Sequence, residues 1–284
     1  MAFPPGLALQ KAVIDDGIEI HYVTQGEGPA LVFVHGGMGD WSSWAPQWPA
    51  FTVHYCCYSY SRRFSSPNRN SLEGSSHSVF CEARDLIALL RQWPHERFIL
   101  VGTSYGAYTA LQAALTWPEK ILAMALTEPP VLAFTDRSPG GAAALRQFQQ
   151  EVLQPSNLAF AEGHTELAVR LLSEGINGGG TGEASSPEGR TRRLRNALAM
   201  QALALSQDPY PALDEQAMRG LAMPILLMRG ENTAEVHRAT FEAVKALMPQ
   251  ARVLEMAGSG HGVHREVPHA FNQAVLSFLR EHGI

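Results

Sequence analysis

One short segment of this 284-residue sequence has the residue types and spacing for nucleophilic chemistry. Residues 102–106 read Gly-Thr-Ser-Tyr-Gly, between the apolar run 97–101 and the helix-forming run 107–115. A Gly-x-Ser-x-Gly turn between a strand and a helix lifts the serine hydroxyl above the sheet edge, and its glycines tolerate close neighbouring backbone. A serine hydroxyl is unreactive at neutral pH until an adjacent base takes its proton. The segment therefore predicts Ser104 as a nucleophile and implies a base elsewhere in the chain.

Strand-like and helix-like segments alternate around this turn. Strands separated by helices predict a mostly parallel sheet that is covered on both faces, with ligands at the carboxyl ends of the strands. Trp41, Trp44 and Trp48 are spaced three and four residues apart, which predicts one helix face within 40–49. We expect strands at 11–14 and 18–24 (joined by a turn at 15–17), 30–34, 53–60, 97–101, 121–127, 224–229 and 251–256. We expect helices at 77–92, 107–115, 234–248 and 266–282.

Three segments together resemble the α/β-hydrolase superfamily. Residues 32–37 read Val-Phe-Val-His-Gly-Gly, residues 102–106 carry the serine turn, and residues 257–262 read Ala-Gly-Ser-Gly-His-Gly after the strand-like run 251–256. They stand in the order typical of that family. The resemblance implies an α/β fold with a doubly wound, mostly parallel sheet and a helical cap insertion.

The expected insertion occupies residues 128–222. Its helix-like runs are 141–153, 158–174, 190–206 and 212–220, interrupted by the glycine-rich residues 175–182 and by Ser-Ser-Pro at 185–187. The resemblance implies that 1–127 and 223–284 form the hydrolase core and that 128–222 form a helical cap, which either gates the site or is merely joined by a linker. The arginines of one run, Arg190, Arg192, Arg193 and Arg195, are predicted to form a solvated helix face and not a carboxylate clamp.

The resemblance also implies a catalytic histidine in the 257–262 loop. His261 fits the family's Gly-x-Gly-His pattern, and an imidazole titrates near the pH at which most enzymes work. His264 is an alternative three residues later, and we expect it to be structural.

The third member of the expected triad departs from the common pattern. Relatives usually carry an aspartate in a Gly-x-x-Asp stretch, but residues 230–233 read Gly-Glu-Asn-Thr here, and Thr233 cannot hold a charge. Some relatives place the acid after the preceding strand, where this chain has Glu128 followed by two prolines. Glu128 is therefore the predicted acid, with Glu231 and Asn232 in reserve; alternatively, Glu128 bonds to the cap.

The resemblance implies an oxyanion hole made of backbone N–H groups. Tyr105, at the start of the helix after the turn, supplies one N–H, and Gly37 supplies the second, with Met38 as a substitute. His35 is expected to shape this loop through hydrogen bonds. Arg62 and Arg63 follow a predicted strand, where they either tie loops together or meet a substrate carboxylate.

Bulk composition narrows the function further. Apolar residues make up 45% of the chain, charged residues 17%, and the net charge is −5, which favours neither nucleic acid nor an anionic membrane surface. Residues 1–6 lack the features of a signal peptide, and three cysteines form no disulfide framework, so we expect a cytoplasmic protein with reduced thiols. No residues have metal-ligand spacing or form a phosphate-binding loop, so we expect no metal and no cofactor. Leucine, alanine and methionine in the cap suggest a small-molecule, mainly apolar substrate.

The leading prediction is hydrolysis of an ester or a lactone through an acyl-enzyme on Ser104. Relatives that open epoxides or displace halide use aspartate at the nucleophile position, so the serine argues against those reactions. Two alternatives stay open: cleavage of a carbon–carbon bond with the same triad, and a non-catalytic ligand-binding protein with a hydrolase fold.

Overall fold

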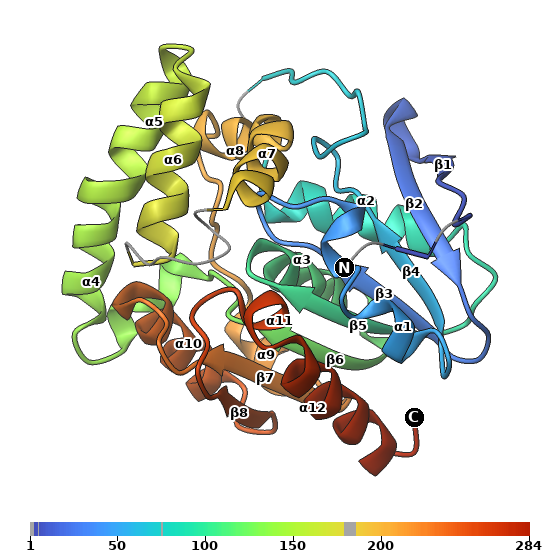
Figure 1. Ribbon diagram of the computed structural model, residues 1–284. Coiled ribbons are helices and arrows are strands. Elements are labelled where there is room, and N and C mark those ends of the chain that lie inside the picture. Colours follow the sequence, from blue (N-terminus) through green and yellow to red (C-terminus); the bar gives the residue numbers. More distant parts are fainter. Residues whose placement is uncertain (1–2, 5, 75, 179–185) are drawn as a thin grey trace.

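An eight-stranded sheet forms the centre of the protein. The computed structural model describes residues 3–4, 6–74, 76–178 and 186–284 (Figure 1). The strand order is β1-β2-β4-β3-β5-β6-β7-β8; β2 pairs antiparallel with β1 and β4, and the other pairings are parallel. The predicted α/β fold class is confirmed. The strands are β1 (Gln10–Val13), β2 (Glu19–Gln25), β3 (Ala30–Val34), β4 (Cys56–Tyr60), β5 (Phe98–Thr103), β6 (Ile121–Thr127), β7 (Ile225–Gly230) and β8 (Arg252–Met256).

The central strands are apolar because both faces of the sheet are buried. Strand β3 has no exposed residue: Ala30, Val32 and Val34 join one hydrophobic cluster, and Leu31 and Phe33 join the other. Side chains alternate between the two faces of a strand, so a continuous apolar run is what a doubly covered sheet requires.

Helices cover the two faces as the alternation of elements predicts. Helices α2 and α3 pack against each other on one face, while α1 and α12 contribute to the cluster on the other. Figure 1 shows α12, in dark red, on the side of the sheet that also carries α1. The core helices are α1 (Trp48–Phe51), α2 (Val79–Leu90), α3 (Tyr105–Thr116), α10 (Glu235–Leu247), α11 (Val263–Glu266) and α12 (Pro268–Glu281).

The chain between β6 and β7 forms a group of helices beside the sheet. Figure 1 shows them gathered on one side of the core, in green, yellow and orange. Part of the predicted glycine-rich interruption, residues 179–182, and Ser185 lie outside the described residues. The helices of this group are α4 (Gly141–Phe148), a π-helical turn (Gln149–Leu153), α5 (Gln154–Ala161), α6 (Thr165–Ile176), α7 (Pro187–Arg195) and α8 (Ala197–Ala204). The last helix before β7 is α9 (Glu215–Gly220), which packs on α10.

The tryptophan segment differs from the prediction. Residues 40–49 form no single helix; they form a 3₁₀ turn at Trp41–Trp44, and α1 then begins at Trp48. Pro46 and Pro49 have no N–H to donate, so a continuous helix across them would lose two backbone hydrogen bonds. Trp44 and Trp48 still pack on Phe33, at ring-centroid distances of 4.9 and 6.2 Å.

Two further properties of the fold bear on the sequence analysis. Cys56, Cys57 and Cys81 are all free thiols. Within the described ranges, no helix has the length and apolar character needed to cross a bilayer.

Candidate active site

The turn after β5 holds Ser104 in a strained conformation. Its φ of 52° and ψ of −127° lie where non-glycine residues are rarely found. The flanking glycines are required by space, since a Cβ at Gly102 would lie 2.7 Å from Ala107 Cα, and one at Gly106 would lie 2.2 Å from the Val34 carbonyl oxygen. Tyr105 is the first residue of α3, so its N–H has no acceptor within the helix.

The loop after β3 lies against this turn. A Cβ built on Gly36 would be 3.3 Å from Ser104 Cβ. The Gly36 carbonyl oxygen accepts hydrogen bonds from His35 Nδ1 at 2.8 Å, Gly39 N at 3.1 Å and Arg62 Nη2 at 3.3 Å. The Gly36 carbonyl and the Gly37 N–H belong to one trans peptide and point in opposite directions. The Gly37 N–H therefore points away from these three donors.

Buried polar side chains hold this loop in place. Burial and the charge of Arg62 lower the pKa of His35 to about 3, so the imidazole is neutral. Its Nδ1 donates to Gly36 and its Nε2 accepts from Arg62 N at 3.0 Å, which defines one tautomer. The Arg62 guanidinium, 1% exposed, also binds Glu82 at 2.8 Å. Arg63 pairs with Asp85 at 2.6 Å, so of the two expectations for these arginines, the structure shows them tying loops together.

Glu128 stands at the carboxyl end of β6, next to the serine turn. In the β5–β6 register Thr103 faces Thr127, and Ser104 N donates to the Thr127 carbonyl oxygen at 2.8 Å. Glu128 itself has a left-handed φ of 45° and is 2% exposed. Parallel pairing of the two strands therefore places Ser104 and Glu128 at the same edge of the sheet.

The Glu128 carboxylate contacts His261. His261 Nδ1 lies 2.5 Å from Glu128 Oε2, while Gly230 N donates to Oε1 and Thr233 Oγ1 to Oε2, each at 2.8 Å. Burial alone would raise the pKa of Glu128, but the hydrogen bond from His261 and the charge of His261 hold that pKa below its ordinary value. Glu128 is therefore a carboxylate at neutral pH, and His261 Nδ1 is a donor, which leaves Nε2 as the acceptor nitrogen.

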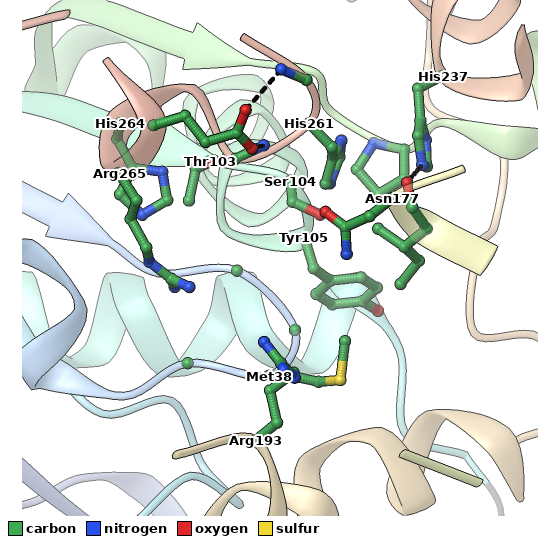
Figure 2. A pocket seen from close by; sticks show the side chains of 18 of the residues that line it. Met38, Thr103, Ser104, Tyr105, Asn177, Arg193, His237, His261, His264 and Arg265 are labelled. Atoms are coloured by element: carbon green, nitrogen blue, oxygen red, sulfur yellow. Dashed lines mark hydrogen bonds between the residues drawn. The ribbon is translucent and has the colours of Figure 1, made fainter. Parts of the chain in front are cut away.

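Ser104 and His261 line one cavity of about 370 Å³ (Figure 2). Gly37 and Tyr105, the predicted oxyanion donors, and Met38, their alternative, line it as well. Among the described residues no hydrogen bond connects Ser104 Oγ with His261 Nε2. Contacts of this kind are commonly long in unliganded sites and shorten when substrate binds.

The reserve candidates for the third residue occupy other positions. The Glu231 carboxylate accepts from Gly258 N at 2.8 Å, and Asn232 lines the cavity. Within the part of the chain that the structure describes, neither side chain hydrogen-bonds to His261. His264 is 2% exposed, its ring 4.7 Å from that of Trp44, and it also lines the cavity.

His237 on α10 also lies at this site, although no sequence pattern predicts it. Its ring stacks on that of His261, with centroids 4.2 Å apart and planes inclined by 24°. His237 Nε2 donates to the carbonyl oxygen of Ile176, at the end of α6, at 3.0 Å. Burial and the charge of His261 lower the pKa of His237 to about 3, so the ring is neutral. No local motif marks this residue, because its role depends on where α10 packs.

Glu128, His237 and His261 also form a set of possible metal ligands. Their ligand atoms lie within 4.8 Å of one another. Carboxylate and imidazole groups bind zinc in many proteins. A metal ion at this position would have to replace the hydrogen bond between His261 and Glu128, so the set fits the Glu–His pair better than a resident metal.

Apart from the residues described above, the cavity is lined by an apolar group of side chains and by two arginines, Arg193 from α7 and Arg265 from α11. The prediction that the arginines of 190–195 form a solvated face is wrong for Arg193, which is 7% exposed. Arg195 forms an ion pair with Asp40 at 2.5 Å. The apolar wall consists of Met38, Pro130, Leu132, Phe148, Ile176, Met200 and Tyr210.

The chain is similar to known proteins over most of its length. The model of the "Alpha/beta hydrolase family" matches residues 31–274. The chain is 26% identical over 257 residues to the sn-1-specific diacylglycerol lipase of Mus musculus, covering 88% of this chain and 81% of the lipase. It is 23% identical over 271 residues to the 2-(acetamidomethylene)succinate hydrolase of Mesorhizobium japonicum, covering 92% of each chain.

A solved structure shows the same fold. Est816, described as an N-acyl homoserine lactone degrading enzyme, superposes with a TM-score of 0.74 at 20% identity. The match covers 95% of this chain and 100% of that chain.

Proposed function

The chain belongs to the alpha/beta hydrolase family, and on this premise we propose that it cleaves an ester or a lactone through an acyl-enzyme formed on Ser104. The observation that carries the proposal is the hydrogen bond between His261 Nδ1 and Glu128, because His261 lines the same cavity as the strained Ser104. A carboxylate that holds one ring nitrogen as a donor leaves the other nitrogen free to accept a proton.

In the first half of the reaction His261 Nε2 removes the proton from Ser104 Oγ, and the oxygen attacks the substrate carbonyl carbon. Glu128 stabilises the imidazolium that forms. The N–H groups of Gly37 and Tyr105 donate to the developing oxyanion, and Tyr105 adds the favourable end of the α3 dipole. The imidazolium then protonates the leaving alcohol oxygen.

In the second half a water molecule takes the place of the alcohol. His261 Nε2 removes a proton from the water, which attacks the acyl carbon, and the imidazolium returns a proton to Ser104 Oγ. An ester thus yields an acid and an alcohol, whereas a lactone yields one hydroxy acid. No redox change and no cofactor enter this scheme.

The helical insertion serves as the roof of the site in this proposal. Residues 1–127 and 223–284 are the hydrolase core, and 128–222 are the cap. Phe148, Ile176 and Met200, all from the insertion, border the cavity and favour an apolar portion of the substrate. The names of two matched proteins, a diacylglycerol lipase and a lactone-degrading enzyme, agree with an ester or a lactone as the substrate.

Covalent labelling tests the proposal. A fluorophosphonate should label the wild-type protein on Ser104, and 4-nitrophenyl esters should leave an acyl group on the same residue, detected by mass spectrometry. Ser104→Ala should abolish both, and Ser71→Ala, at an exposed serine, should not. Turnover in Ser104→Ala above about a hundredth of the wild-type kcat would contradict the acyl-enzyme, because triad members contribute roughly 10⁴-fold or more. Release of two carbon-containing fragments from a diketone, with no ester turnover, would point to carbon–carbon cleavage.

A further inference from the structure

One buried arginine contacts both segments that carry the predicted oxyanion donors. Arg62 lies two residues after the end of β4 and is 1% exposed. Its Nη2 donates to the carbonyl oxygens of Gly36 and Gly37, each at 3.3 Å. Its guanidinium carbon lies 5.1 Å from the centroid of the Tyr105 ring. A single planar group therefore joins the loop after β3 to the first residue of α3.

Each of the two carbonyl contacts belongs to a peptide group that also carries a candidate donor. The Gly36 carbonyl shares its peptide with the Gly37 N–H, and the Gly37 carbonyl shares its peptide with the Met38 N–H. In a trans peptide the carbonyl and the N–H point in opposite directions. Arg62 thus fixes the direction of both N–H groups, whichever of them serves as the donor. A cation beside a carbonyl oxygen also polarises the peptide, which strengthens its N–H as a donor.

The contact with the Tyr105 ring extends to the other predicted donor. Tyr105 is 2% exposed, and its hydroxyl donates to the carbonyl oxygen of Pro209 at 2.8 Å. A guanidinium within about 6 Å of an aromatic centroid is attracted to the ring. The ring is therefore held by Arg62 and by the chain between α8 and α9. Because the predicted donor is the backbone N–H of the same residue, fixing the ring restricts the movement of that N–H.

Arg62 is held in turn by a buried carboxylate on α2. Its Nη1 donates to Glu82 Oε1 at 2.8 Å, and Glu82 is 1% exposed. Burial alone would raise the pKa of Glu82, but the charge of Arg62 and the hydrogen bond and charge of His77 lower it to about 2, so this carboxyl group is ionised at neutral pH. A buried ion pair is costly to break, because each partner would leave the other uncompensated. The position of the guanidinium is therefore fixed from its far side.

We propose that Arg62 is the positioning residue of the oxyanion hole, and that its two carbonyl contacts and its contact with the Tyr105 ring hold the donors on both sides at the separation that the oxyanion requires. The inference rests on the proposed function, in which the N–H groups of Gly37 and Tyr105 stabilise the developing charge. Arg62 does not touch the reacting atoms and acts through the loop and the serine turn. Oxyanion donors must lie about 2.7–3.1 Å from the oxygen that becomes charged, so a small displacement of either donor lowers kcat.

A thiono ester tests the hole directly. 4-Nitrophenyl butanoate and its thiono analogue, in which sulfur replaces the carbonyl oxygen, differ only in the atom that enters the hole. Sulfur is larger and a weaker hydrogen-bond acceptor, so a well-formed hole favours the oxygen ester. Arg62→Lys keeps a positive charge for Glu82 but loses the planar fork, and it should lower kcat for the oxygen ester by roughly 10- to 100-fold with little change in KM. The oxygen-to-thiono ratio of kcat/KM should fall by roughly tenfold in this variant.

Arg63→Lys is the matched control. Arg63 is the next residue in the chain and also pairs with a carboxylate of α2, Asp85, at 2.6 Å. Among the described residues, its guanidinium makes no hydrogen bond to the loop at 36–38, so Arg63→Lys should leave the oxygen-to-thiono ratio unchanged. If circular dichroism shows that Arg62→Lys does not fold, the paired variant Arg62→Met with Glu82→Gln takes its place. That pair removes both buried charges, leaves neither uncompensated, and should show the same fall in the ratio.

The outcomes separate the positioning role from the proposed function. Ser104-dependent turnover in which Arg62→Lys leaves the ratio unchanged, or in which Arg63→Lys lowers it equally, overturns the positioning role and leaves the hydrolase proposal standing. If the wild-type protein turns over neither ester, amide hydrogen exchange of peptides that contain residues 36–38 and 105 still decides. Faster exchange in Arg62→Lys but not in Arg63→Lys supports the positioning of these N–H groups, and unchanged exchange in Arg62→Lys refutes it.

Discussion

Thr233 donates its hydroxyl hydrogen to Glu128 Oε2 at 2.8 Å, across the gap between the ends of β7 and β6. Gly230 N and His261 Nδ1 donate to the same carboxylate. Three donors satisfy a buried charge that would otherwise be costly. Thr233, at the position where the resemblance implies an acid, therefore supports the carboxylate that we propose as the acid, Glu128 on the neighbouring strand.

Glu128→Gln should lower kcat by roughly 10²- to 10⁴-fold, because an amide cannot stabilise the imidazolium and favours the wrong tautomer. Thr233→Val, which removes one donor and keeps the carboxylate, should cost far less. Steady-state kinetics on a neutral 4-nitrophenyl ester measure both. Glu231→Gln is the matched control, since that carboxylate bonds to Gly258 N and not to His261. A Glu231→Gln loss equal to that of Glu128→Gln would reverse the assignment.

His261→Ala should be nearly as damaging as Ser104→Ala, because nucleophile and base act as a unit. The double variant should therefore lose little more than either single one. His269→Ala, at an exposed histidine on α12, controls for general effects of removing an imidazole. A more severe kcat loss for His264→Ala than for His261→Ala, in folded protein, would make His264 the base.

His237 should orient the catalytic imidazole through stacking. His237→Ala removes the ring that lies 4.2 Å from His261 and should lower kcat by roughly 10- to 100-fold, the scale of a small misplacement of a reacting group. His237→Phe keeps a flat ring but loses the hydrogen bond to Ile176, and it should recover most of kcat. Equal losses in the two variants would assign the effect to that hydrogen bond and not to stacking.

Glu82 should make folding sensitive to acid. Burial alone would raise the pKa of Glu82, but the charges of Arg62 and His77 and the hydrogen bond with His77 lower it from an ordinary 4.5 to about 2. A lowered carboxyl pKa stabilises the folded state above pH 4.5, and this stabilisation is lost as the pH falls toward 2, in total roughly 2–4 kcal/mol. Urea unfolding between pH 7 and pH 3 should show a gap between wild type and Glu82→Gln that narrows in acid. Glu73→Gln, at an exposed residue, should show no such change; a constant Glu82→Gln gap would contradict the prediction.

The order of strands and helices could be predicted because the pattern of apolar residues within each element shows which of its faces are buried. The continuous apolar run of β3 indicates a strand that is buried on both faces. The serine turn directly follows β5, as the motif requires. The tryptophan segment was predicted wrongly because its spacing suits a helix, whereas its two prolines prevent a continuous one.

The positions of residues that reach the site only through tertiary packing could not be predicted from the local sequence. His237 reaches His261 only because α10 packs beside the loop after β8, and the sequence separation gives no sign of it. Arg193 belongs to a run of arginines that is typical of a solvated helix, yet the placement of α7 buries this one and leaves Arg190 exposed. Glu128 could be proposed in advance because Thr233 excluded the common position.

Glu128 directly follows the last residue of β6 and precedes Pro129 and Pro130. This position limits where the helical insertion can be exchanged for that of another protein. A chimaera that exchanges the helical insertion for one from a relative needs its first junction after Pro130. A junction at the end of β6 would remove the proposed acid together with the roof, and its Thr233 partner on the retained segment would be left without the carboxylate it supports. If the proposed acid and the proposed cap are correct, the boundary between the segment that sets substrate range and the catalytic residues is only a few residues long.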